Sequence, residues 1–89
     1  LFLRKINHRE LNNIMENIIT VRLNTLKDFR EFMECATMLN GSARAIQGET
    51  NVDAKSTLGI ASIMDTGSFN LKLIDCSETE LSKFRKWEV

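Results

Sequence analysis

Histidine and cysteine are scarce in this sequence. His8 is the only histidine among the 89 residues, and Cys35 and Cys76 are the only cysteines. Two cysteines provide neither a disulfide framework nor a zinc cluster, so we interpret both as small, partly buried thiols of a reduced chain. We therefore expect a cytoplasmic protein that holds no metal ion and no cofactor.

An excess of charge and a long apolar segment are missing as well. Twelve basic residues match twelve acidic ones, whereas a protein that binds nucleic acid through phosphate contacts has a basic excess. No apolar run approaches the ~18 residues of a membrane span. Arg4 and Lys5 directly follow the apolar start of the chain, which is unlike a signal-peptide core. The remaining class is a single small globular domain with no direct partner in nucleic acid or membrane.

The first fourteen residues differ from the rest of the chain. They contain three basic residues, one acidic residue and His8, and they show no convincing amphipathic period. We interpret residues 1–14 as a loose extension or as translated upstream sequence, with Met15 as the true start; a short terminal helix is the alternative. The domain then comprises residues 15–89.

From residue 18 onward, hydrophobic periodicity predicts alternating strands and helices. The predicted order is a strand at 18–23, a helix from Thr25 to Asn40-Gly41, strands at about 43–47 and 51–54 joined by a turn at 48–50, a short helix from Ser56, a strand at 69–73 and a helix from Ser77. This βαββαβα order predicts an α+β open-faced sandwich, in which a four-stranded antiparallel sheet has three helices on one face.

Capping residues support the predicted helices. Thr25, with Asp28 three residues later, is typical of a helix start, and Gly41 is expected to end that helix in the left-handed conformation. Ser77 and Glu80 form a second capping-box pattern. The buried side chains are expected to be Phe29, Phe32, Met33, Ala36 and Leu39 in the first helix and Leu81, Phe84 and Trp87 in the last.

The end of the third strand and the short helix carry a recognisable motif, Lys-Ser-x-x-Gly, within residues 51–62. This segment resembles HPr, the histidine-containing phosphocarrier of the bacterial phosphoenolpyruvate-dependent sugar phosphotransferase system. The resemblance covers about residues 17–88 and includes the element order. The matching positions in the motif region are Val52, Lys55, Ser56, Leu58, Gly59, Ile60 and Ser62.

The sequence departs from the HPr pattern where the family carries its phosphoryl group. An ungapped count from Ser56 places Thr25 at the family's histidine, Lys27 at its arginine and Asp28 at its proline. A phosphocarrier needs a ring nitrogen that is nucleophilic at neutral pH, and a threonine hydroxyl without a base does not replace it. His8 lies outside the domain pattern and is an improbable acceptor. We expect no carrier activity and no enzyme.

One branch of the HPr family loses the histidine and keeps the serine. These catabolite-repression paralogues, known as Crh in Gram-positive bacteria, are phosphorylated on the serine by HPr kinase/phosphorylase and then bind a LacI-type transcription regulator. This resemblance implies a regulatory module that is switched by phosphorylation at Ser56, with Lys55, Leu58 and Ile60 at the partner-binding surface.

Simpler interpretations remain beside these. Ser56 is also a plain N-cap, and Leu58 is also a half-buried residue under the first helix. Thr25 and Lys27 form either a residual anion site at a helix N-terminus or only a cap. The alternative functions are a phosphocarrier that uses a non-standard residue, and a degenerate HPr-like domain that serves only as a partner-binding surface.

Overall fold

The structure, a computed structural model, describes residues 17–89, so the expectations for residues 1–14, for His8 and for Met15 lie outside the described residues. The elements follow the predicted βαββαβα order, and the last helix is divided in two. They are β1 (Ile18–Val21), α2 (Leu26–Thr37), β2 (Ser42–Gln47), β3 (Thr50–Asp53), α3 (Thr57–Met64), β4 (Phe69–Ile74), α4 (Glu78–Ser82) and a short 3-10 helix, η1 (Arg85–Trp87).

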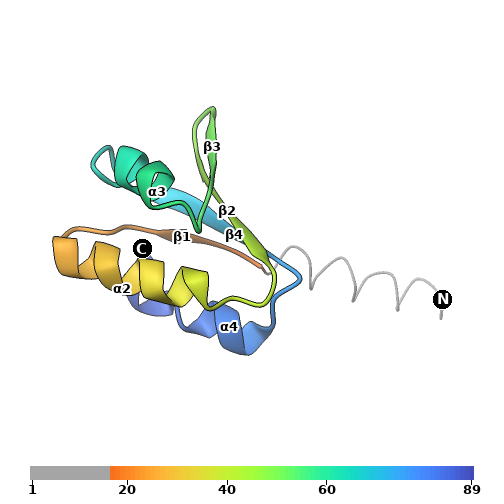
Figure 1. Cartoon of the computed structure of the whole chain (residues 1–89). Helices are drawn as coiled ribbons and strands as arrows, with labels where there is room; N and C mark the ends of the chain where they lie inside the picture. Colours follow the sequence, from red (N-terminus) through yellow and green to blue (C-terminus); the bar gives the residue numbers. More distant parts are fainter. Residues whose placement is uncertain (1–16) are drawn as a thin grey trace, which may run out of the picture.

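The four strands form one antiparallel sheet in the order β1-β4-β2-β3. The helices lie on one side of this sheet. α2 and α4 lie next to each other, whereas α3 lies apart from α4, near β3 (Figure 1), and contacts β3 and α2. This arrangement confirms the predicted open-faced sandwich. The outer edge of β1 pairs with the segment after η1, where the N–H of Val89 donates to the carbonyl oxygen of Thr20 at 3.0 Å.

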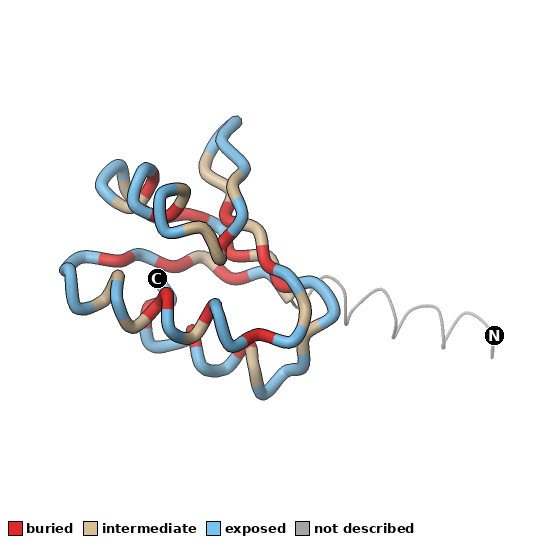
Figure 2. The backbone as a smooth tube through the Cα atoms, viewed as in Figure 1, coloured by how far each residue is buried: buried red, intermediate tan, exposed pale blue. Residues whose placement is uncertain are grey.

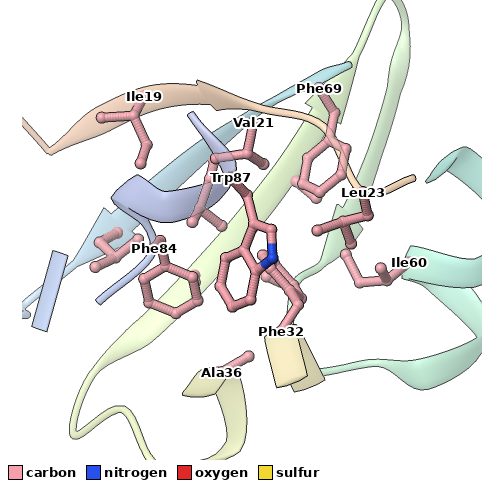
Figure 3. Close-up of a cluster of buried hydrophobic side chains, with 14 of the residues drawn as sticks. Ile19, Val21, Leu23, Phe32, Ala36, Ile60, Phe69, Phe84 and Trp87 are labelled. Atoms are coloured by element: carbon pink, nitrogen blue, oxygen red, sulfur yellow. The ribbon is translucent and has the colours of Figure 1, made fainter. Parts of the chain in front are cut away.

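The core lies between the sheet and the helices. Buried residues alternate with exposed or half-buried ones along β1, β4 and the first part of β2, so these strands present one face to the helices and the other away from them (Figure 2). The edge strand β3 contains no buried residue. Phe32 is completely buried, and its ring meets the rings of Phe69, Phe84 and Trp87 edge-on at centroid distances of 5.3–5.8 Å (Figure 3). The predicted buried faces of the first and last helices are confirmed, except that Phe29 is only partly buried. Cys35 and Cys76 are partly buried, as predicted.

The α2 helix ends earlier than the sequence predicts, and Gly41 has a different role. The helix ends at Thr37 with Met38 as its C-cap, and Gly41 does not adopt a positive φ. A Cβ atom on Gly41 would lie far inside van der Waals contact of the Ile74 carbonyl oxygen and 2.6 Å from that of Asp75. The glycine is therefore required by the close approach of two backbone segments, and the predicted left-handed stop is wrong.

The β2–β3 connection is a two-residue turn, one residue shorter than predicted. Gln47 pairs with Thr50, and Gly48 has φ +60° at the first of the two central positions, as in a type II′ hairpin turn. Across residues 17–89, none of the helices combines the length and apolar character needed to cross a membrane.

Candidate functional site

The hydroxyl of Ser56 caps the N-terminus of α3, as the sequence predicts. After β3 the chain turns sharply, because the N–H groups of Lys55 and Ser56 donate to the side-chain and main-chain oxygens of Asp53, both at 2.9 Å. Ser56 is extended, and its Oγ accepts a hydrogen bond from the N–H of Gly59 at 3.1 Å. The side chain therefore lies at the positive end of the α3 dipole, where negative charge is stabilised.

Lys55, a predicted partner-binding residue, makes a contact within the fold. Its ammonium group donates to the carbonyl oxygen of Leu39 at 3.1 Å, and this contact is partly buried. In the same loop, the N–H of Asn40 donates to the carboxylate of Glu80 at 2.9 Å. The loop after α2 is thus joined to α3 on one side and to α4 on the other, and Lys55 holds the first turn of α3 in place.

Leu58 and Ile60 have opposite environments, although both were predicted at the partner-binding surface. Leu58 is 83% exposed, so its expected exposure is confirmed. Ile60 has no exposed surface and points into the core near Leu23 (Figure 3). Two residues along an α-helix span about 200°, so the two side chains cannot share a face. The prediction for Ile60 is wrong, because Ile60 is a core residue that no partner reaches.

Gly59 allows α3 to approach β3 closely. A Cβ atom at this position would lie 3.0 Å from Cβ of Val52 and 3.3 Å from Cβ of Ser56. A larger residue would push the first turn of α3 away from the hairpin. The glycine of the Lys-Ser-x-x-Gly motif therefore has a packing role that supports the position of the Ser56 hydroxyl.

The side chains of Thr25 and Asp28 both form hydrogen bonds at the N-terminus of α2. The Oγ of Thr25 accepts from the N–H of Asp28 at 3.0 Å, and the carboxylate of Asp28 accepts from the N–H of Asn24 at 3.0 Å. The hydrogen bond from Asn24, with a smaller contribution from the Trp87 side chain, lowers the pKa of Asp28. A carboxylate that is ionised at neutral pH is thus held beside the helix N-terminus.

These contacts argue against the predicted anion site at Thr25 and Lys27. The Asp28 carboxylate already compensates the positive end of the α2 dipole and repels a second anion. The ammonium of Lys27 lies 4.0 Å from the carboxylate of Glu31, to which Lys86 is also paired at 3.6 Å. Thr25 therefore acts as a cap, which is the simpler of its two interpretations.

Three side-chain hydroxyls cap α-helices in residues 17–89, and their surroundings differ. Thr25 has Asp28 in the first turn of its helix, and Ser77 has Glu78 and Glu80. The first turn of α3, which Ser56 caps, contains no acidic residue. Among these three hydroxyls, Ser56 is therefore the one at which an added negative charge would meet no carboxylate from the first turn of its own helix.

No family model matches the chain, and no match was found among curated proteins or among solved structures. Within residues 17–89, no group of three or more histidine, cysteine, aspartate or glutamate side chains is arranged to hold a metal ion.

Sequence reasoning missed the contacts that hold this site in place. The bond from Lys55 to Leu39 joins residues sixteen positions apart, and that from Asn40 to Glu80 joins residues forty apart. Both use a main-chain group on one side, which every residue possesses. No local sequence signal identifies which carbonyl or N–H a distant side chain will reach.

Proposed function

We propose that this chain is an HPr-like protein related to the bacterial phosphoenolpyruvate-dependent sugar phosphotransferase system, and that it is a regulatory protein-binding module. In this proposal, phosphorylation of Ser56 is the switch and the phosphocarrier histidine is lost. The βαββαβα order with its four-stranded antiparallel sheet supports the proposal. So does the position of Lys55 and Ser56 at the junction of β3 and α3.

The observation that carries the proposal is the setting of Ser56. Its hydroxyl lies at a helix N-terminus whose first turn has no acidic residue, and the exposed Leu58 follows two residues later. A phosphoryl group at Ser56 would meet main-chain N–H groups and would add negative charge beside an apolar side chain. A partner with a basic group and an apolar pocket would then distinguish the two states.

The α2 N-terminus supports the absence of a carrier function. Thr25 stands where the family has its phosphorylated histidine, and its hydroxyl is engaged as the α2 cap. No histidine occurs after His8. A threonine hydroxyl that no base activates stays protonated at neutral pH and is a far weaker nucleophile than an imidazole nitrogen, and the Asp28 carboxylate would repel an incoming phosphoryl donor.

The proposed partners are proteins. HPr kinase/phosphorylase would add the phosphoryl group, and a LacI-type transcription regulator would bind the phosphorylated form, both in the cytoplasm. The chain itself would be a binding module and would catalyse no reaction. Lys55 would reach the regulator only by leaving the Leu39 carbonyl, so we place the main contact at Ser56 and Leu58.

The test is phosphorylation of the full chain by HPr kinase/phosphorylase and ATP, with the modified residue located by mass spectrometry. We expect phosphate at Ser56, loss of labelling in Ser56→Ala and full labelling in the matched cap variant Ser77→Ala. A parallel incubation with phosphoenolpyruvate and the general phosphotransferase enzyme should give no acid-labile phosphate.

Two results would refute the proposal. If an intact HPr is modified under the same conditions and this chain is not, the switch is absent and only a partner-binding surface remains. Stoichiometric acid-labile labelling in the second incubation would instead indicate a phosphocarrier that acts through a non-standard residue.

A further inference from the structure

The sheet face that the helices leave uncovered carries two rows of side chains in register. The residues of these rows alternate with the buried ones, and all of them are exposed or half-buried. Strand by strand, in the order β1-β4-β2-β3, one row is Ile18, Lys72, Arg44 and Asp53, and the next is Thr20, Asn70, Ile46 and Asn51.

Two cations occupy the centre of the first row, and neither has an ionic partner among residues 17–89. Arg44 on β2 is directly opposite Lys72 on β4, and like charges at opposite positions destabilise a sheet. The guanidinium of Arg44 donates to the side-chain and main-chain oxygens of Asn51, at 2.9 and 3.2 Å. Asp53 lies across from Arg44, but its carboxylate accepts from the N–H of Lys55. No carboxylate of residues 17–89 lies within 4.0 Å of either cation.

The helical side of the molecule differs in its charge pairing. The ion pairs of the described residues are all located there, in α2 and around η1. They join Lys27 and Lys86 to Glu31, and Arg85 to Glu88. Within the described part of the chain, the sheet face therefore carries positive charge that no carboxylate pairs with, held in fixed register by the strand ladders. Such a surface is complementary to a carboxylate-bearing partner.

The side chains next to Arg44 and Lys72 indicate which class of partner this face could bind. Ile18, 44% exposed, lies next to Lys72 across the β1–β4 ladder, and the half-buried Ile46 follows Arg44 on the same face of β2. Every aromatic residue of the described chain lies in the core or in the helical layer. Sheets that bind single-stranded nucleic acid stack its bases on aromatic side chains, which this face does not offer.

We propose that the uncovered sheet face, centred on Arg44 and Lys72, binds an acidic segment of a partner protein that presents carboxylates and aliphatic side chains on the same face. The carboxylates would pair with the two cations, and the aliphatic groups would cover Ile18 and Ile46. This surface is opposite the helical layer that contains Ser56, and its binding requires no phosphorylation.

The experiment uses the full chain and a labelled peptide in which pairs of glutamates alternate with pairs of valines, so that the extended peptide presents both kinds of side chain on one face. Fluorescence anisotropy measures its affinity, and NMR chemical-shift changes locate the contact. We expect shifts confined to β2, β4 and β1. In the Arg44→Gln/Lys72→Gln double variant, we expect affinity to fall by more than about tenfold, since both carboxylate contacts are lost. The matched variant Arg30→Gln/Lys83→Gln removes the same charge from the helical layer, and we expect a change within about twofold.

Several outcomes would overturn this inference. Undiminished binding by the Arg44→Gln/Lys72→Gln variant would do so, provided that its thermal unfolding matches wild type. Absence of peptide binding, or shifts confined to the helical layer, would have the same effect. An oligonucleotide of equal charge that displaces the peptide would indicate nucleic acid instead. Nuclear Overhauser contacts from residues 1–16 to Lys72 in the free chain would show that this segment covers the face.

Discussion

Replacement of Ser56 by aspartate tests the electrostatic setting of the proposed switch. Aspartate caps a helix as well as serine does, so the hydrogen bond from the N–H of Gly59 should be retained. The added charge should gain about 0.3–1 kcal/mol from the α3 dipole. Asp53, whose carboxylate is turned toward the N–H of Lys55, offsets part of this gain. We expect the free energy of unfolding to stay at the wild-type value or to rise by up to about 1 kcal/mol.

Two further variants separate the charge effect from the loss of a cap. Ser56→Ala removes the hydroxyl that bonds to Gly59, and should lower the free energy of unfolding by about 1 kcal/mol. Ser77→Asp places a carboxylate beside that of Glu80, which lies 3.3 Å from the Ser77 hydroxyl, with Glu78 adjacent. We expect this repulsion to cost about 1 kcal/mol or more.

Urea denaturation followed by the fluorescence of Trp87, the only tryptophan and a buried one, measures all three variants. The Ser56→Asp gain should shrink as salt is added, because the new charge is near the surface. A loss of more than about 1 kcal/mol in Ser56→Asp would refute the reasoning. So would equal stability of Ser56→Asp and Ser77→Asp, since the absence of acidic residues from the first turn of α3 would then be irrelevant.

Two further predictions concern the fold that supports the site. Gly41→Ala should lower the free energy of unfolding by about 3 kcal/mol or more, and thermal denaturation should show Tm falling by about 12 °C or more, because the added methyl meets two backbone carbonyls. Gly41→Asn should be no better, because its side chain would meet the same two carbonyls. Gly48→Asn should cost less than Gly41→Ala, because only the positive φ, and no neighbouring atom, opposes a side chain there; a mild effect of Gly41→Asn would restore the left-handed cap. The N–H groups of Ser77 and Asn40 lower the pKa of Glu80, so its contribution to stability is complete at neutral pH and is lost as the pH falls below about 4. Urea midpoints at acid and neutral pH should therefore differ less in Glu80→Gln than in wild type; an unchanged difference would contradict this assignment.

Local sequence pattern predicts which segments form strands and helices and, in β1, α2 and the last helix, which side of each is buried. Strand alternation at Ile19 and Val21 and helical spacing at Phe32 and Ala36 place these side chains in the core, as the structure confirms. The capping residues of the helices could also be predicted from the sequence, because a cap and the N–H group that it binds are three residues apart. These patterns depend only on residues a few positions apart, so they can be recognised without knowing how the rest of the chain folds.

Only some features of the candidate site could be predicted from the sequence. Ser56 as a cap follows from local pattern, whereas the exposure of Leu58 was implied by the family resemblance; both are confirmed. The burial of Ile60 and the engagement of Lys55 depend on how α3 lies against the core and against the loop after α2. A short apolar helix contains several hydrophobic residues, so its sequence does not state which of them face the core.

Tertiary structure alone decided where α2 ends and which surfaces remain open. The helix stops at Thr37, before Gly41, because the chain must pass against the backbone of Ile74 and Asp75. The strand order β1-β4-β2-β3 brings Arg44 opposite Lys72, twenty-eight residues later in the chain. Packing between distant segments sets both features, and no residue on either side carries a local signal of its eventual neighbour.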